Sequence, residues 1–153
     1  MVKTSVIIPC WITDNTLLHL THRCLETVRE TSKVELIVVD NASTQGQHMM
    51  MEYADVYVRN TKNLGFTRAI NQGVVLSTKE YIVIGNNDYF VEPGWEKVLI
   101  DTLNENSKYM TVTPHTGGKI PEYDTDYRDW ETDRKSTRLN SSHRSLSRMP
   151  SSA

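Results

Sequence analysis

ELIVVD, residues Glu35–Asp40, is the stretch that decides the fold. Its four inner residues are all branched and apolar, so the segment has no polar face. Continuous apolar runs of this kind are typical of strands in a parallel sheet that is covered on both faces. A similar run, SVIIP at Ser5–Pro9, comes earlier, and between the two lies an amphipathic helical pattern behind a capping Asp14. We therefore predict a β-α-β unit whose helix packs through Leu17, Leu18, Cys24, Leu25 and Val28.

The chain continues the alternation of apolar runs and helical patterns. The further predicted elements are a weak helix at 47–54, a strand at Val56–Arg59, a helix within 65–77, a strand at 81–84, a helix after Pro93 and a strand near 109–114. The helix within 65–77 places Phe66, Ala69, Ile70, Gly73 and Val74 at helical spacing. This order predicts an α/β fold, a mostly parallel sheet with helices on both faces and right-handed crossovers.

Composition limits the class of protein. The 153 residues are 38% hydrophobic and 24% charged, which suits one soluble domain with a core of its own. No apolar run is long enough to cross a bilayer, and the apolar segment at the start is too short for a signal peptide. Cys10 and Cys24 lie in a predicted strand end and a helix, which fits free thiols in a reducing compartment. We therefore expect a cytoplasmic protein.

The charge is divided unevenly along the chain. From Arg134 onward there are five basic residues and no acidic one, whereas the first 133 residues carry a net charge of −7. The end of the chain is rich in Ser and Arg and has few large apolar residues, so disorder is expected over 128–153. That segment also resembles translated sequencing-adapter read-through, which would make it non-native. A basic tail could alternatively bind nucleic acid, although no nucleic-acid partner is expected.

Polar residues follow three of the predicted strands at their carboxyl ends. These are PCW at 9–11, DNAST at 40–44 and GNNDYF at 85–90. In open α/β sheets, ligands bind beyond the carboxyl ends of the strands. The three stretches are therefore expected to converge on one binding edge.

Four blocks carry a family resemblance. SVIIPCW, ELIVVDNAST, NLGFTRAINQG and IVIGNNDYFVEPGW occur in this order between about Lys3 and Leu103. Together they resemble the family 2 glycosyltransferases, inverting enzymes with the Rossmann-like GT-A fold, and GNND is most similar to the rhamnosyltransferase-type members. The resemblance implies transfer of a sugar from a UDP-, dTDP- or GDP-linked donor to a saccharide or lipid-linked acceptor, in cell-wall or polysaccharide biosynthesis. It also implies a parent protein that is cytoplasmic, with possible attachment to the membrane surface.

The first two blocks would hold the nucleoside. By the resemblance, the Asp40 carboxylate meets the base, while Pro9, Cys10 and Trp11 flank the base and the ribose. The alternative is that Asp40 only caps the turn formed by the residues after it.

The third block would hold the diphosphate. Gly65 allows the chain to approach a ligand closely, and Arg68 lies in the first helical turn, where its charge and the helix N-terminus favour phosphate. Asn63 would tie the loop to neighbouring backbone. The alternatives are that Arg68 is a solvated helical residue and that Gly73 serves close packing.

The fourth block would hold a metal. The family places an acidic motif here, where a divalent cation bridges protein and diphosphate, so Asp88 is the predicted ligand for Mg²⁺ or Mn²⁺. Asn86 and Asn87 depart from the all-acid form of the motif and are expected to contact the nucleotide. Each amide could coordinate the metal by its oxygen or hydrogen-bond the ribose or donor sugar, but it adds no charge, so metal affinity without bound nucleotide should be weak. The alternative is a turn rich in Asn and Asp.

The general base that inversion requires is missing from the matching blocks. In this family it lies in the second half of the catalytic domain, so residues 1–127 are expected to form a truncated GT-A domain that carries mainly donor and metal binding. The chain could then be an inert nucleotide-binding fragment. A nucleotidyltransferase is disfavoured because PCWITDNT, after the first strand, lacks the Gly and basic residues of a triphosphate loop.

Overall fold

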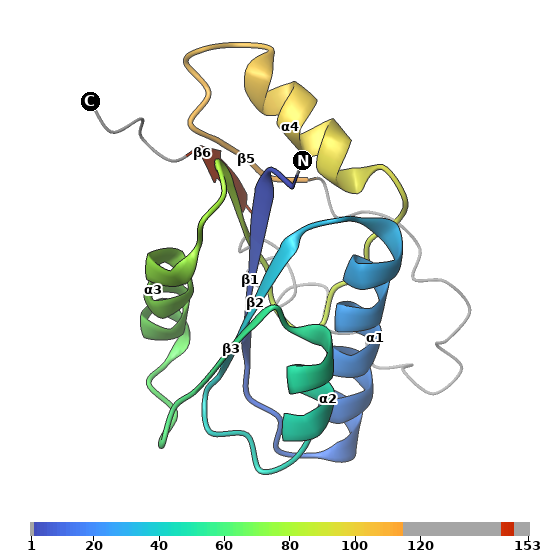
Figure 1. Cartoon of the computed structure of the whole chain (residues 1–153), viewed down its shortest axis with the longest axis vertical. Helices are drawn as coiled ribbons and strands as arrows, with labels where there is room; N and C mark the ends of the chain where they lie inside the picture. The colour runs from blue at the N-terminus through green and yellow to red at the C-terminus, as the bar shows by residue number, and fades with distance from the viewer. Residues whose placement is uncertain (1, 115–144, 149–153) are drawn as a thin grey trace, which may run out of the picture.

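The fold is known from a computed structural model, which describes residues 2–114 and 145–148 (Figure 1). It contains one six-stranded sheet with the strand order β3-β2-β1-β4-β6-β5. The strands are β1 (Thr4–Cys10), β2 (Glu35–Asp40), β3 (Val56–Arg59), β4 (Tyr81–Ile84), β5 (Thr111–Val112) and β6 (Ser145–Arg148). The first four strands are paired in parallel. The predicted α/β fold with a mostly parallel sheet is therefore confirmed.

Within residues 2–114, four helices connect the strands and cover the sheet on both sides. They are α1 (Asn15–Thr31), α2 (Gln47–Tyr53), α3 (Phe66–Leu76) and α4 (Trp95–Asn104). Helix α3 lies on one side of the sheet, and α1 and α2 lie on the other (Figure 1). The alternation of strands and helices through β5 follows the order predicted from the sequence.

The alternating side chains of the central strands build two cores. Val6, Ile8 and Cys10 of β1 face α1, α2 and α4 together with Leu36 and Val38 of β2. The residues between them face α3; this second core comprises Ile7, Ile37, Val39, Ala69, Ile70 and Ile82. Because both faces are covered, β1 and β2 need apolar side chains at nearly every position, which is why their sequences lack polar alternation.

Helix α1 follows the predicted pattern. Asp14 caps it by accepting a hydrogen bond from the Leu17 amide at 2.9 Å. Its buried residues are Thr21, Cys24, Leu25 and Val28, and Leu17 and Leu18 pack at the border of the core. Cys10 and Cys24 are both buried free thiols.

Helix α3 packs closely on the sheet through Gly73. A methyl group at that position would lie 2.3 Å from Cγ2 of Ile7, so only glycine permits this approach. The expectation that Gly73 serves packing is therefore confirmed. Phe66 differs from the prediction, because it is 38% exposed rather than packed in the core. Phe66 is the first residue of α3, whereas the buried residues of the helix are Ala69, Ile70 and Gly73.

Strands β5 and β6 form the far side of the sheet. β6 lies between β4 and β5 and is antiparallel to both. Its four residues fall inside the segment 128–153 that the sequence predicts to be disordered, and pairing with β4 gives their backbone groups the partners that such a short polar segment lacks alone. The other residues of that segment and the 127/128 boundary lie outside the described residues.

Candidate functional site

The carboxyl ends of β1, β2 and β3 meet at one edge of the sheet. The Asn41 amide donates to the Cys10 carbonyl at 2.7 Å, and the Asn60 amide donates to the Asp40 carbonyl at 2.8 Å. The backbone pairing of β2 with β1, and of β3 with β2, therefore continues one residue past the ends of β2 and β3. Beside them, the Gly85 amide after β4 donates to the Ile7 carbonyl at 3.1 Å. The stretches PCW, DNAST and GNNDYF thus leave the sheet along the same edge, as predicted.

The Asp40 carboxylate lies at this edge and is bound by three protein groups. Oδ1 accepts from the Ser43 amide at 2.7 Å, while Oδ2 accepts from the Tyr57 hydroxyl at 2.7 Å and forms an ion pair with Arg59. The Asp40 side chain has no exposed surface. Asp40 therefore does cap the turn after β2, and it also joins β2 to the end of β3.

Tyr57 and Arg59 complete the polar cluster around this carboxylate. Burial, followed by the hydrogen bond to Asp40, raises the pKa of Tyr57 to about 12. The Tyr57 hydroxyl therefore remains a donor at neutral pH. Arg59 additionally donates from Nη2 to the Ser43 carbonyl at 3.0 Å, and its side chain is 42% exposed.

The end of β1 exposes only one of the three residues expected to flank a nucleoside. Pro9 and Cys10 are buried, whereas Trp11 is 51% exposed. Burial, together with the nearby Cys24 and Asp40, raises the pKa of the Cys10 thiol well above its usual value. The Cys10 thiol is therefore neutral at physiological pH, and only the indole of Trp11 offers a side-chain surface at this point.

A network of amide side chains holds the loop between β3 and α3. Asn41 donates from Nδ2 to Asn63 Oδ1 at 2.9 Å and to the Gly65 carbonyl at 3.3 Å. Its Oδ1 accepts from Asn60 Nδ2 at 3.1 Å and from the Leu64 amide at 3.0 Å. Asn60 and Gln72 exchange two further hydrogen bonds of 2.9 Å. The network fixes the loop that leads into α3.

Gly65 begins α3 in a conformation that favours glycine. Its φ is +84°, and no protein atom would lie within 4 Å of a methyl group there, so the backbone faces open space. Asn63 Oδ1 accepts from the Gly65 amide at 2.8 Å, as expected for a residue that ties the loop to neighbouring backbone.

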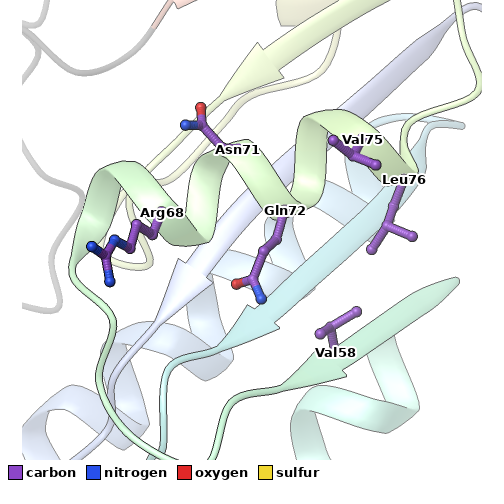
Figure 2. Close-up of a pocket in the computed structure, with 6 residues that line it drawn as sticks. All are labelled: Val58, Arg68, Asn71, Gln72, Val75 and Leu76. Atoms are coloured by element: carbon purple, nitrogen blue, oxygen red, sulfur yellow. The ribbon is translucent and has the colours of Figure 1, made fainter.

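Arg68 lies on the exposed side of α3. It lines a surface cavity of about 540 Å³ between α3 and β3, together with Val58, Asn71, Gln72, Val75 and Leu76 (Figure 2). Among the described residues, none forms a hydrogen bond or ion pair with Arg68. The structure therefore leaves its guanidinium accessible and does not bring it into contact with Asn86–Asp88.

The segment after β4 is anchored on α1 and leaves Asp88 exposed. The Cys24 thiol donates to the Asn86 carbonyl at 3.6 Å, and Asn87 Nδ2 donates to Thr21 Oγ1 at 2.7 Å. Gly85 permits the turn, because a methyl group there would lie 2.2 Å from the ring of buried Tyr89. No hydrogen bond or ion pair to the described part of the chain involves the Asp88 carboxylate.

The residues after β4 suit a divalent cation only when a bound molecule, such as a diphosphate, supplies further ligands to it. Within 2–114, no three His, Cys, Asp or Glu side chains gather as a metal site. Asp88 supplies a single accessible carboxylate, with the Asn86 and Asn87 side chains in the adjacent positions. Mg²⁺ is commonly held by one or two carboxylates together with substrate phosphates and water, so the residues fit a metal that arrives with a diphosphate.

Sequence reasoning missed several residues of this edge. Tyr57 and Arg59 hold Asp40, while Asn41, Asn60 and Gln72 hold the loop before α3. The sequence did carry a signal for Tyr57 and Arg59, because VYVRN at 56–60 ends the third predicted strand at the same edge as Asp40. The side-chain partners themselves depend on the tertiary fold.

A parallel sheet with polar side chains gathered at its carboxyl edge places this chain among the open α/β proteins, whose ligands bind beyond the carboxyl ends of the strands. Residues 5–151 match Glycosyl transferase family 2, and the chain belongs to that family. No curated protein matches the chain in sequence.

Solved glycosyltransferases share the fold. The mannosyltransferase PcManGT from Pyrobaculum calidifontis, solved in complex with GDP-Man and Mn²⁺, is 22% identical with a TM-score of 0.63; the match covers 75% of this chain and 36% of PcManGT. Residues 1–349 of S. aureus TarS, solved in complex with UDP-GlcNAc, are 16% identical with a TM-score of 0.60, covering 78% and 37%. The likeness supports the GT-A fold, and the chain spans less than two fifths of these proteins. In the part of the chain that the structure describes, no helix is long and apolar enough to span a bilayer.

Proposed function

We propose that this chain binds a nucleoside-diphosphate sugar at the carboxyl edge of its sheet and takes part in sugar transfer to an acceptor hydroxyl with inversion. The observation that carries this proposal is the accessible Asp88 carboxylate at the end of β4 in a chain of Glycosyl transferase family 2. Polar groups that have no structural partner at a ligand-binding edge are candidates for ligand contacts.

The nucleoside is proposed to lie beside Trp11 and the Asp40 cluster. Trp11 offers an exposed aromatic face for the base, and Pro9 and Cys10 can contribute only backbone. Asp40 is proposed to contribute indirectly to base binding, because it holds Ser43, Tyr57 and Arg59 in place at this edge.

The diphosphate is proposed to lie near the start of α3. Arg68 can approach phosphate oxygens without first breaking an ion pair, because it has none among the described residues. Asn63 and Gly65 shape the loop in front of the helix.

A divalent cation, Mg²⁺ or Mn²⁺, would be held by Asp88 together with the diphosphate. When bound, it would neutralise the charge that grows on the leaving diphosphate. Asn86 and Asn87 would orient the donor sugar by hydrogen bonds. The similarity of GNND to rhamnosyltransferases supports a deoxyhexose donor.

The acceptor is proposed to be a saccharide or lipid-linked saccharide of cell-wall or polysaccharide synthesis. The acidic cluster at 121–133, which could include a general base, lies outside the described residues. Since the chain spans 36% of PcManGT, the second candidate function is donor binding without turnover.

Calorimetric titration of the full chain with UDP, dTDP and GDP, with and without Mn²⁺, tests the proposal. Binding should depend on Mn²⁺ and weaken at least about tenfold in Asp88→Asn, because the remaining amide adds no charge. Glu52→Gln on α2 removes an exposed carboxylate elsewhere and should change nothing. Equal binding by folded Asp88→Asn would contradict the metal role.

A second assay separates an enzyme from a binding fragment. It measures whether the chain releases free sugar from a nucleotide-sugar donor or transfers the sugar to an added acceptor.

A further inference from the structure

Strand β3 forms one outer edge of the sheet. Among the described residues, β2 is its only strand neighbour, so the other side of β3 is an open edge. The Asn60 amide donates to the Asp40 carbonyl, and backbone groups alternate in direction along a strand. The backbone N–H and C=O of Val58 therefore face β2, whereas those of Tyr57 and Arg59 face the open edge.

This open edge lacks residues that usually block strand pairing. Val56–Arg59 contains no proline and no lysine, and the Arg59 side chain is held against Asp40 rather than projecting beyond the edge. An unpaired strand edge can add a strand from another chain, with main-chain hydrogen bonds as the contact. The outward backbone groups of β3 are therefore available for such pairing.

A surface cavity lies beside the open edge. It has a volume of about 540 Å³, and its apolar part is formed by Val58 of β3 and by Val75 and Leu76 of α3 (Figure 2). Val75 is 84% exposed and Leu76 is 38% exposed. Because side chains alternate along a strand, a strand added to β3 would turn every second side chain toward this side of the sheet. Apolar side chains at those positions would cover exposed apolar surface.

Strand β3 itself has the sequence that this edge requires. In an antiparallel pair of two copies centred on Tyr57, the two Tyr57 residues exchange backbone hydrogen bonds, and Val56 lies opposite Val58 of the second copy. Val56 packs on the side of the sheet that α3 covers, so the valines of both copies lie on the side of the cavity.

The same register brings opposite charges together. Asp55 lies opposite Arg59 of the second copy, and the two side chains are 48% and 42% exposed. The Asp55 side chain is fixed by Arg29 and by the Leu36 amide, each through Oδ2. Opposite charges at facing positions of an antiparallel pair are favourable.

Other centres of pairing fit less well. Centring on Arg59 would place two Arg59 side chains opposite each other, and like charges at facing positions are unfavourable. Centring on Val58 would bring together backbone groups that already face β2. The charges and the backbone directions of β3 therefore select the pairing about Tyr57.

We propose that the chain forms a dimer by antiparallel pairing of β3 with β3 of a second copy, about a two-fold axis at Tyr57. The contact is closed, because each copy contributes the same surface. A strand of four residues makes a small interface, so the association is weak, with a dissociation constant on the order of 10–100 µM. The carboxyl edges of the two sheets point in opposite directions, so each copy keeps its own edge accessible.

Sedimentation velocity of the full chain measures this association. The mass should rise from that of one chain toward that of two between about 1 and 500 µM, and a monomer throughout this range would overturn the proposal. Val58→Asp should raise the dissociation constant at least about tenfold, because it places a carboxylate beside a valine of the second copy. An unchanged dissociation constant in folded Val58→Asp would overturn the proposal.

Two exposed positions complete this comparison. Val75→Asp, at a position that is 84% exposed, should raise the dissociation constant at least about threefold, and it replaces Val58→Asp if that variant does not fold. Val98→Asp, at a position of α4 that is 63% exposed, should leave the dissociation constant unchanged. A dimer that is lost in Val98→Asp and kept in Val75→Asp would overturn the proposal, because another face would then be the interface.

Cysteine pairs test the register. Val56 and Val58 of the second copy should have Cα atoms about 4.5 Å apart, within the range of a disulfide. A mixture of Val56→Cys and Val58→Cys chains, with glutathione disulfide as the oxidant, should form cross-linked dimers, and either variant alone should form far fewer. The native thiols of Cys10 and Cys24 are buried. Cross-linking that is no greater in the mixture than in the single variants would overturn the proposed pairing about Tyr57.

Discussion

The Tyr57 hydroxyl donates to Oδ2 of Asp40 at 2.7 Å, and this bond joins β3 to β2 beneath the binding edge. The carboxylate lies in the core without exposed surface. A buried charge persists only when hydrogen bonds and counter-ions replace water. Tyr57 is therefore part of the support that holds the Asp40 carboxylate and Arg59 in place.

Tyr57→Phe should lower the free energy of unfolding by about 1.5–3 kcal/mol, the usual contribution of a hydrogen bond to a charged group. The folded pKa of about 12 exceeds the ordinary value of 10, so the folded state keeps a proton that the unfolded state loses. The stability from Tyr57 is thus complete below pH 10 and declines as pH rises toward 12. Urea unfolding of both proteins from pH 8 to 11.5 should show their difference shrinking. Tyr109→Phe, which removes an exposed phenol, is the control; a pH-independent difference would contradict the assignment.

Asn41→Ala should release the loop between β3 and α3. Asn41 is 4% exposed and makes four side-chain hydrogen bonds, to Asn60, Asn63, Leu64 and Gly65. Its removal takes the acceptor from the Leu64 amide and one of two partners from Asn60, Asn63 and the Gly65 carbonyl, so stability should fall by about 1–3 kcal/mol. Amide exchange at 61–66 should accelerate more than exchange in β1.

Asn41→Asp is the sharper companion because it keeps the shape and loses the donors to Asn63 and Gly65. It should disturb the loop nearly as much as Asn41→Ala. Asn15→Ala, at an exposed position at the start of α1, is the matched control. Loop exchange that is unchanged in Asn41→Ala would show that the amide network does not hold the loop.

The sheet and its helices could be predicted from the sequence because their signals are local. Glu35–Asp40 must be covered on both faces whatever surrounds it, and β3 at Val56–Arg59 has the predicted bounds. The edge position of Asp40 and Asp88 follows from the same topology. Helical spacing alone could not predict that Phe66 is exposed, since exposure depends on how α3 packs on the sheet.

The side-chain partners within the site could not be predicted from local sequence patterns. Asp40 and Arg59 are 19 residues apart, and their ion pair requires the register in which Asp40 lies opposite Arg59 in the sheet. The resemblance directed attention to Asp40 as a group facing the base, whereas its exposure depends on how Tyr57, Arg59 and the turn at Ser43 enclose it. The sequence therefore located the edge, and only the fold distinguishes closed groups from accessible ones.

Gly73→Ala should destabilise the contact between α3 and the sheet. The new methyl group would lie 2.3 Å from Cγ2 of Ile7, a fully buried residue in β1. Overpacking of this kind typically costs about 1–3 kcal/mol. Thermal or urea unfolding should show the loss, and it should shrink when Ile7→Ala is added to make room, although Ile7→Ala is itself destabilising. If the losses of unfolding free energy from the two substitutions were simply additive, positions 73 and 7 would not contact each other in the fold.

Glu35 should make the fold sensitive to acid. Burial acts to raise the pKa of its carboxyl, but hydrogen bonds from Ser5 and Thr78 and the nearby Lys79 outweigh it, so the pKa is lowered. A lowered folded pKa contributes stability that is present above the ordinary value near 4.5 and is lost as pH falls through the folded value. Glu35→Gln should therefore cost about 1 kcal/mol at pH 7 and less at pH 3, because an amide accepts more weakly than a carboxylate. Urea midpoints from pH 7 to 3 measure this, with Glu105→Gln at an exposed position after α4 as control. A Glu35→Gln deficit that grows toward pH 3 would mean that the carboxylate is not stabilised by these donors.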